Sequence, residues 1–312
     1  MMMQLFYILV FPGFLFLCLM ALAIEYFDRI VYARLQNRKG PPFYQPLADF
    51  IKLTAKEEIV PECADKRLFK LMPIIAVTAA VTAFFYIPIW GYESLFPFKG
   101  DIIVILYILT IPTVTFFIAG WSSTSLYATI GATRTLTQLF SYEVLLFLSV
   151  LAPALLADTW SMSEIAIYYS ANPAMMLVNI LAFFISLVAM LGKLEKVPFD
   201  IAEAETEIVG GTFTEYTGRF LALFRMAIDI EMVVGASLIA AVFLPFGLSM
   251  GPVYGFLFYI LKVLFIVFLL SLGRTLFARF RIDQMVHICW KYFAPIAFIQ
   301  IVIILIVKGV IL

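Results

Sequence analysis

The chain has 312 residues, of which 64% are hydrophobic and only 13% are charged, and its formal net charge is zero. Soluble domains carry about twice that share of charged residues, so the composition excludes a soluble globular enzyme. With a balanced charge there is also no basis for a nucleic-acid partner. The composition instead indicates a protein embedded in a membrane.

Eight apolar runs long enough to cross a bilayer follow one another along the chain. A hydrocarbon core of about 30 Å needs about 20 apolar helical residues, and runs without period-two alternation favour helices over barrel strands. The runs cover residues 5–23, 71–90, 102–120, 136–157, 174–191, 220–245, 253–272 and 288–307. We therefore expect an all-α, multi-pass protein of the cell membrane, with eight transmembrane helices and a single membrane domain spanning residues 1–312.

Basic residues lie almost entirely in the loops on one side of the predicted spans, and such loops face the cytoplasm. Only Lys99 and Lys308 fall on the opposite side. The cytoplasmic set is Arg29, Arg34, Arg38, Lys39, Lys52, Lys56, Lys66, Arg67, Lys70, Arg134, Lys193, Lys196, Arg219, Arg274, Arg279, Arg281 and Lys291. This asymmetry predicts cytoplasmic loops at about residues 28–70, 193–219 and 273–287, with both termini outside. Because the first run lacks a basic n-region, we expect it to be a span and not a cleaved signal peptide.

The first cytoplasmic loop contains an amphipathic segment after Pro46. Its sequence, LADFIKLTAKEE, places Leu47, Phe50 and Ile51 on one face and Asp49 on another. This pattern predicts an interfacial helix at the membrane surface. Two roles remain open for this helix: it anchors the loop in lipid, or it walls a cavity beneath a docked partner.

The second cytoplasmic loop concentrates carboxylates. The sequence KLEKVPFDIAEAETEIVGGTFTEYTGR begins at residue 193, and its Gly210-Gly211 pair predicts a bent, re-entrant path. Carboxylates held close together in a partly dry site raise one another's pKa and can exchange protons near neutral pH. We therefore expect a proton-relay or charge-coupling role, with a simple solvated face as the alternative. The acidic residues of this loop are Asp200, Glu203, Glu205, Glu207 and Glu215.

The third cytoplasmic loop is basic. Arg274, Arg279 and Arg281 are candidates to pair with the acidic loop, and Asp283 offers a partner within the same segment. Arginine suits such pairing because its guanidinium presents a fixed fork of donors. Docking of a partner and simple anchoring on the cytoplasmic side both remain open for this loop.

Ionisable residues inside the predicted spans are costly in lipid and are functional candidates. Glu143 lies in the fourth span and has no neutralising neighbour in its own helix, so it is either protonated or faces a polar channel. Lys262 lies midway along the seventh span. In the sixth, Arg225 and Asp229 share a helix face and can form an internal ion pair, with Glu231 close by.

The potential metal ligands are too scattered to form a centre. The cysteines Cys18, Cys63 and Cys289 stand singly, and His287 is the only histidine. Metal sites need clustered thiolates or imidazoles. We therefore expect no catalytic residue, metal or other cofactor in this chain, and His287 is interpreted as a hydrogen-bonded residue near the membrane boundary.

Five linked motifs cover nearly the whole chain. They are DRIVYARLQNRKGP at residues 28–41, QPLADFIKLTAKEEIVP at 45–61, SYEVLLFLS at 141–149, PFDIAEAETEIVGGTFTEYTG at 198–218 and RFRIDQ at 279–284. In this order they resemble the subunit 1 or H family of respiratory complex I and its relatives in energy-converting, membrane-bound NiFe hydrogenases.

The resemblance implies a subunit that joins a peripheral redox arm to an ion-pumping membrane arm. Together with the charges inside the spans, it gives as coupling residues Glu143, Asp200, Glu203, Glu205, Glu207, Glu215, Asp229, Glu231 and Lys262. The docking surface would comprise Asp28, Arg34, Gln36, Arg38, Asp49, Arg274, Arg279, Arg281 and Asp283. The implied partners are hydrogenase-like catalytic and iron–sulfur subunits on the cytoplasmic face, which carry iron–sulfur clusters and a possible NiFe centre, antiporter-like membrane subunits, and lipid.

Several positions depart from the pattern of complex I. The chain runs from Gly40 to Gln45 with no inserted residues, Lys193 replaces a usual Glu, Glu195 replaces a usual Asn, and Asp229 stands in the stretch that usually reads Ala-Glu-Tyr. The short connection resembles the hydrogenase branch, and the departures together disfavour a quinone chamber of the usual shape.

The expected function is that of a membrane anchor and coupling subunit of a complex I-like oxidoreductase. Ferredoxin-linked formation of hydrogen or sulfide would drive proton or sodium translocation. The alternative is a quinone-binding subunit of an NADH-, ferredoxin- or deazaflavin-linked quinone oxidoreductase. A standalone secondary transporter is disfavoured because the sequence shows no internal repeat, and a purely structural scaffold is the remaining reading.

Overall fold

The computed structural model describes residues 2–89, 91, 93–248 and 250–311, so Trp90 at the end of the second predicted span lies outside the described residues. In the described part, every regular element is helical, which confirms the all-α class. The elements are α1 (Met2–Leu9), α2 (Phe14–Leu35), α3 (Gln45–Thr54), α4 (Lys66–Phe84), α5 (Asp101–Ser122), α6 (Leu126–Ala157), α7 (Met162–Ala171), α8 (Met175–Val178), α9 (Ile180–Lys193), α10 (Glu205–Ile208), η1 (Gly211–Phe213), α11 (Gly218–Phe243), α12 (Pro252–Leu276), α13 (Ile282–Ile288), η2 (Cys289–Phe293) and α14 (Ala294–Ile311).

Seven helical segments among the described residues are long and apolar enough to cross a membrane. They correspond to seven of the eight predicted runs. The remaining run, residues 174–191, contains α8 and the 14-residue α9. A helix of that length extends about 21 Å, less than the thickness of a hydrocarbon core. The chain is therefore a multi-pass membrane protein, and its described residues hold seven helices long enough to span and one shorter apolar helix.

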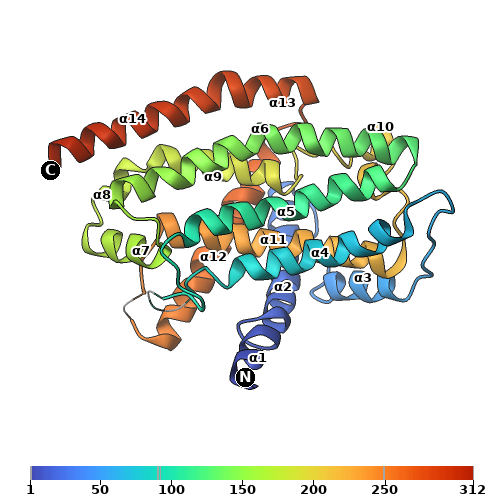
Figure 1. The fold of residues 1–312 in the computed structure, drawn as a ribbon, viewed down its shortest axis with the longest axis horizontal. Helices are drawn as coiled ribbons and strands as arrows, with labels where there is room; N and C mark the ends of the chain where they lie inside the picture. Colours follow the sequence, from blue (N-terminus) through green and yellow to red (C-terminus); the bar gives the residue numbers. More distant parts are fainter. Residues whose placement is uncertain (1, 90, 92, 249, 312) are drawn as a thin grey trace.

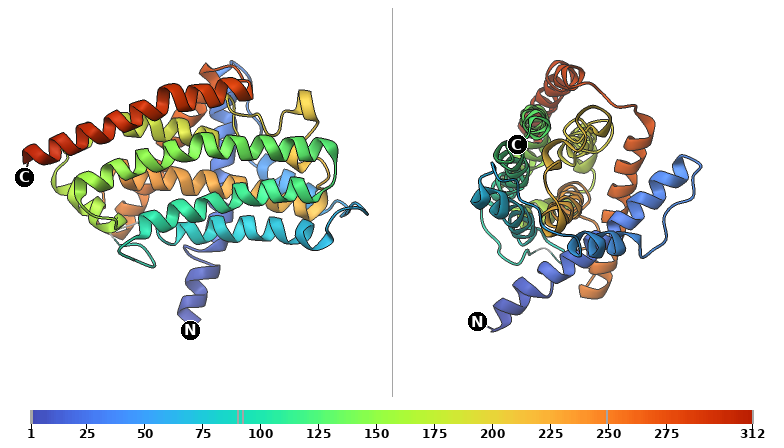
Figure 2. Two further views of the ribbon diagram at one scale, coloured as in Figure 1. Left: turned by 45° about the horizontal axis from the view of Figure 1, so that its top comes forward. Right: turned by 90° about the vertical axis from the view of Figure 1, so that its right-hand side faces the viewer.

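The helices form a bundle around α11. In Figure 1, α4, α5 and α6 run side by side in front of α11, α9 packs against α6, and α14 runs along α6 at the edge of the bundle. Figure 2 shows α2 and α12 on the other side, where both contact α11. The most apolar stretch of α11 is 89% buried, whereas that of the segment containing α14 is 22% buried. The polar side chains Glu231 and Ser237 of α11 are thus held inside the protein.

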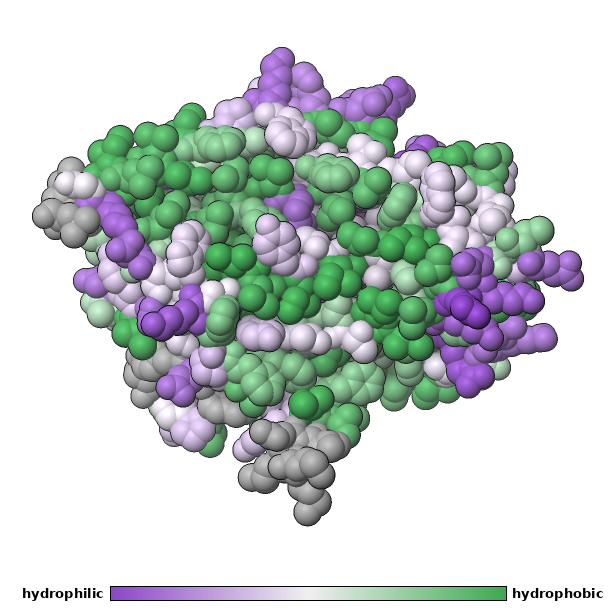
Figure 3. All heavy atoms as spheres, in the orientation of Figure 1, coloured by the Kyte–Doolittle hydropathy of each residue, from purple (hydrophilic) through white to green (hydrophobic). Residues whose placement is uncertain are grey.

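The surface divides into an apolar belt and a charged end. In Figure 3 the middle of the molecule is green, and the densest purple group lies at the end where Figure 1 places α3 and the loop before α4. The amphipathic helix predicted after Pro46 is present as α3, which contacts both α2 and α11. Its Leu47 and Ile51 side chains are exposed, whereas Phe50 packs against the core.

Two glycines place the acidic loop between α9 and α11 against the bundle. Gly131 in α6 faces η1, and a Cβ on it would lie 2.5 Å from the Thr212 nitrogen. Gly211 has a φ of +54°, and a Cβ there would lie 1.8 Å from the Ala202 oxygen. Only glycine fits such close backbone approaches. The loop is therefore bent back into the protein, as the Gly210-Gly211 pair predicts.

Candidate charge-coupling site

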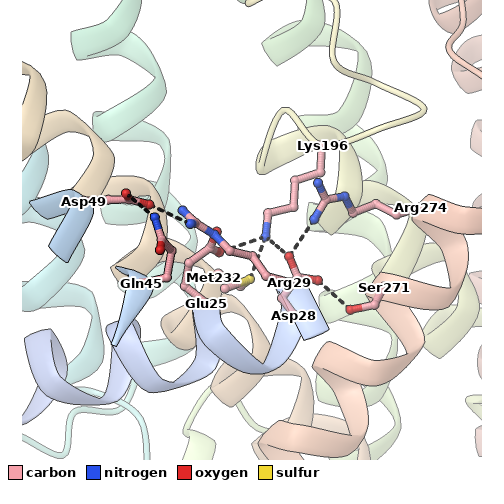
Figure 4. Close-up of polar contacts among 9 residues, drawn as sticks. All are labelled: Glu25, Asp28, Arg29, Gln45, Asp49, Lys196, Met232, Ser271 and Arg274. Atoms are coloured by element: carbon pink, nitrogen blue, oxygen red, sulfur yellow. Dashed lines mark hydrogen bonds and ion pairs between the residues drawn. The ribbon is translucent and has the colours of Figure 1, made fainter. Parts of the chain in front are cut away.

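The buried carboxylate of Asp28 joins three separate parts of the chain. Its Oδ2 accepts hydrogen bonds from Lys196 Nζ and Arg274 NH1, both at 2.6 Å, and its Oδ1 accepts one from Ser271 at 2.5 Å (Figure 4). Asp28 is only 1% exposed. A buried charge is tolerated when it is paired and hydrogen-bonded. These contacts connect α2, the loop after α9, and α12.

The same cluster extends to the surface helix α3. Arg29 Nε lies 2.7 Å from Glu25, and its NH1 lies 2.8 Å from Asp49 of α3 (Figure 4). Gln45 donates a second bond to Asp49 at 2.9 Å. Lys196 Nζ lies 3.5 Å from Glu25, so it links this half of the cluster to Asp28. The position of α3 is therefore coupled to the charges beneath it.

Lys196 stays charged in this cluster. Burial opposes its charge, but the Asp28 and Glu25 carboxylates outweigh burial and raise the pKa of Lys196 above its ordinary value. It therefore acts as a fixed positive charge at the centre of the network.

A cavity of about 470 Å³ opens beside this cluster. Its walls come from α2, α3, α11, α12 and the loop after α9, and they include apolar residues such as Phe50 and Met226. Charged side chains of both signs predominate among the lining residues: Glu25, Arg29, Asp49, Lys52, Lys56, Glu195, Lys196, Asp200, Glu203, Arg225, Asp229 and Arg274. Such a lining suits water and ions better than a long apolar chain.

Two of the five predicted carboxylates of the acidic loop line this cavity. Glu203 lies 3.0 Å from Arg225 NH1. The sequence allowed an ion pair between Arg225 and Asp229, but in the structure Arg225 pairs with Glu203 of the acidic loop. Asp229 faces the cavity, where Glu25 and Lys196 are the strongest charges acting on it. Asp200 also lines the cavity.

The other predicted carboxylates of this loop lie elsewhere. Glu207 is exposed and lies 2.6 Å from Arg134 of α6. That hydrogen bond holds the pKa of Glu207 below its ordinary value. Glu215 is half-buried in the turn before α11. The side chain of Glu205 lies outside the described residues.

Glu195 is a buried carboxylate that the motif comparison noted only as a departure. It is 8% exposed, and neither of its carboxylate oxygens has a hydrogen-bond partner among the described residues. Burial, followed by the charges of Glu203, Glu231 and Asp200, raises the pKa of Glu195 well above its ordinary value. It is therefore a proton-binding group at the inner wall of the cavity.

A second charged group lies deeper, between the helices. Lys193 Nζ in the last turn of α9 is fully buried and lies 3.0 Å from Glu231 of α11. Glu143 of α6 has both carboxylate oxygens buried, with no hydrogen-bond partner in the described part of the chain. The charges of Lys193 and Glu231 both act on Glu143. The structure thus brings two predicted coupling residues together around a lysine that was not predicted.

Lys193 is buried, which its assignment to a cytoplasmic loop did not predict. Its basic side chain was assigned to the cytoplasmic loop, but it ends an apolar helix and is 1% exposed. The motif gave a signal, since Lys193 stands where related sequences carry a Glu after an apolar run. Lys262 of α12 is apart from this group. It donates a 3.0 Å hydrogen bond to the Phe246 carbonyl and has no ion pair among the described residues.

The predicted docking residues divide into exposed and buried sets. Arg34 and Arg38 are exposed at the end of α2, and Arg281 and Asp283 are exposed at the start of α13. Gln36, Asp49 and Arg279 are partly exposed. Asp28 is buried and Arg274 is paired with it, so both belong to the internal network and not to a surface, and Arg274 does not pair with the acidic loop.

In the described part of the chain, no group of three or more His, Cys, Asp or Glu residues could hold a metal ion. The cavity lining and the buried carboxylates are suited to binding charges and taking up protons. The structure shows no catalytic role for any one residue.

Comparison with known proteins adds a family to this geometry. A family model described as NADH dehydrogenase matches residues 7–305. The NADH-quinone oxidoreductase subunit 8 of Thermus thermophilus is 36% identical over 285 residues, covering 86% of this chain and 78% of the relative. The H subunit of the corresponding enzyme of Dehalococcoides mccartyi is 34% identical over 304 residues, covering 95% of this chain and 84% of the relative.

A solved structure has the same fold. A chain of the membrane-bound sulfane sulfur reductase, an archaeal respiratory membrane complex, superposes with a TM-score of 0.85 at 26% identity. The match covers 93% of this chain and 96% of that chain. Similarity therefore extends both to quinone-linked complexes and to a sulfur-reducing one.

Proposed function

Because the chain belongs to the NADH dehydrogenase subunit 1/H family and is a membrane subunit of a complex I-like oxidoreductase, we propose that it is the anchor and coupling subunit. In this proposal it links electron transfer in a docked, hydrogenase-like arm to proton or sodium translocation. The arm is ferredoxin-linked, forms hydrogen or sulfide, and carries the iron–sulfur clusters and any NiFe centre. Antiporter-like subunits adjoin it in the membrane.

One observation carries this proposal: buried charges lead from the cavity into the membrane interior. The series begins at Glu25 and Lys196, continues through Glu195 and Asp229 at the cavity wall, and reaches Lys193, Glu231 and Glu143. Ionisable groups this deep are costly to bury, and they are therefore candidates for a functional role. A change in charge at the cavity therefore has a route to the middle of the bundle.

The proposed orientation follows the charges. The cavity and α3 face the cytoplasm, where the redox arm docks over the exposed Arg34, Arg38, Arg281 and Asp283. Both termini lie outside, as the basic residues predict, with the short α9 as the eighth crossing. Asp49 joins this surface to the network through Arg29.

The test uses the whole complex in sealed, inverted membrane vesicles. We expect Glu143→Gln to leave electron transfer in place but to lower the number of ions moved per electron. Glu164→Gln, which removes an exposed carboxylate at the start of α7, is the matched control and should keep the ratio. An unchanged ratio in Glu143→Gln, with normal assembly, contradicts the coupling role.

A quinone-binding subunit is the second candidate, because several relatives are NADH-quinone oxidoreductase subunits. A cavity of about 470 Å³ can hold a quinone ring, but its many charges disfavour the apolar tail. Extraction of the purified complex followed by mass spectrometry separates the two readings. Quinone at one equivalent per complex would favour the second.

A further inference from the structure

The ammonium group of Lys193 has hydrogen-bond partners besides the carboxylate with which it forms an ion pair. Its Nζ donates hydrogen bonds to the Leu109 carbonyl of α5 and, at 3.5 Å, to Thr113. Leu109 lies in the turn before Pro112, whose missing N–H leaves the preceding Ile108 carbonyl without its helical partner. The main hydrogen bonds of this ammonium group are thus to neutral oxygens.

The contact between Lys193 and Glu231 is a close ion pair without well-aligned hydrogen-bond geometry. The two charges lie 3.0 Å apart, yet neither carboxylate oxygen of Glu231 has a hydrogen-bond partner among the described residues. A hydrogen-bonded, well-aligned pair resists separation, whereas an unaligned pair is held by charge alone. Lys193 is therefore tied to Glu231 by its charge and to α5 by its hydrogen bonds.

Glu143 is a second acceptor for the same cation. It lies in α6, and α9 packs against both α6 and α11, so the helix that carries Lys193 adjoins both carboxylates. Lys193 Nζ is also 5.9 Å from the ring of Tyr142, the residue before Glu143, and Tyr142 shares a 2.9 Å hydrogen bond with Thr113. The ring of Tyr142 and the hydroxyl of Thr113 thus lie close to the ammonium.

One cation faces two buried carboxylates, and it can neutralise only one of them at a time. The carboxylate left without the cation has no hydrogen bond to stabilise its charge and must take up a proton. In the structure the cation is with Glu231, so the arrangement assigns the proton to Glu143.

We infer that Lys193 is a mobile counter-ion that exchanges between Glu231 and Glu143 and thereby moves a proton within the membrane. When Nζ moves to Glu143, that residue releases one proton and Glu231 binds one, while the lysine remains protonated throughout. This inference rests on the proposed coupling function. Lys193 acts as a positioning residue, since it decides which carboxylate holds the proton.

The test variant is Lys193→Arg in the intact complex, because it keeps the buried charge. Arginine aligns with a carboxylate through two parallel hydrogen bonds, so it would fix the cation on one partner. We expect the variant to assemble and transfer electrons but to lose most ion movement per electron. Lys308→Arg, which makes the same change in the 2.6 Å pair with Asp158 outside this group, is the control and should keep the ratio.

Infrared difference spectra between the oxidised and reduced complex supply a second readout. We expect one carboxylic acid C=O band to appear and another to disappear, with one band lost in Glu143→Gln and the other in Glu231→Gln. Both changes should be absent in Lys193→Arg. A static structural pair predicts no such band from Glu231, because that residue then stays ionised.

The outcomes separate the inference from the proposed function. If Lys193→Arg couples as well as the parent, or if no band belongs to Glu231, the mobile counter-ion is overturned even when Glu143→Gln uncouples the complex. If Glu143→Gln itself leaves coupling unchanged, the proposed function fails and the inference fails with it.

Discussion

Two buried carboxylates at the charged end of the molecule have opposite surroundings. Asp28 receives hydrogen bonds from Lys196, Arg274 and Ser271, and these bonds stabilise its negative charge. Glu195 is also buried, but its carboxylate oxygens have no hydrogen-bond partner among the residues that the structure describes. Of the two, Glu195 is the group for which the folded state favours the protonated form.

The raised pKa of Glu195 gives the folded protein a stability that depends on pH. Below the ordinary pKa of glutamate, both the folded and unfolded states bind the proton. As the pH rises toward the raised folded-state pKa, the unfolded chain releases its proton first, and the free energy of unfolding falls. Glu195→Gln removes this loss. We expect the variant complex to melt at a higher temperature than the parent at neutral and alkaline pH, with little difference near about pH 4.

Glu207→Gln is the control with the opposite sign. The Arg134 contact lowers the pKa of Glu207, so its contribution is present above the ordinary glutamate pKa and is lost as the pH falls. That pair is exposed, so the effect is small. Thermal melting across the pH range checks both variants. A Glu195→Gln curve parallel to the parent curve at every pH would contradict the buried, proton-binding assignment.

At the scale of the elements, the approach of α6 to η1 depends on the absence of a side chain at Gly131. A valine there would place its Cβ 2.5 Å from the Thr212 nitrogen and 2.6 Å from the Gly211 carbonyl carbon, and backbone atoms cannot move aside cheaply. Overpacking of this kind costs about 1–3 kcal/mol. We expect Gly131→Val to lower the melting temperature and the yield of assembled complex on native gels.

Gly309→Ala is the matched control, since a Cβ at Gly309 meets nothing within 4 Å. It should assemble and melt as the parent does, because alanine also favours the helix. Equal behaviour of the two glycine variants would show that the acidic loop does not depend on the contact with α6.

Helix boundaries were predictable where an apolar run ends at polar or helix-breaking residues. The sixth predicted span, 220–245, is close to α11 (Gly218–Phe243), and the seventh, 253–272, lies within α12 (Pro252–Leu276). The start of α6 was placed ten residues late, since polar residues such as Arg134 lower the hydropathy of a turn that is still helical. Asn179 divides the fifth run, leaving α9 too short for a standard span.

The site itself was only partly predictable, because its pairs join distant positions. Glu143 and Glu231 stand out in the sequence as charges within apolar runs. Nothing in the sequence shows that Lys193 lies near both of them. Nor does it show that Asp28 pairs with Lys196 and Arg274, which follow it by 168 and 246 positions. Arg225 likewise has two acidic residues within helical or loop reach, and only the fold selects Glu203.

At the scale of the whole molecule, the zero net charge hides a strong separation of charge. Exposed basic residues such as Arg34, Arg38 and Arg281 lie in or next to the loops that the sequence predicts to be cytoplasmic. Charges on a docking surface attract their partner over about 10 Å at 0.1 M salt but over only about 3 Å at 1 M. We therefore expect the peripheral arm to be released from isolated membranes as the salt concentration rises.

Substitution at this surface should move the salt concentration at which half of the arm is released. Arg281→Ala removes an exposed charge and should lower that concentration. Charges at the rim of an interface mainly affect the rate of association and its salt dependence. Lys308→Ala removes a basic residue that is paired with Asp158, far along the chain from the docking loops, and should leave it unchanged. Immunoblots of washed membranes measure the retained arm. Since both variants alter the net charge equally, a matching shift in the two would mean that overall charge, and not this face, holds the arm.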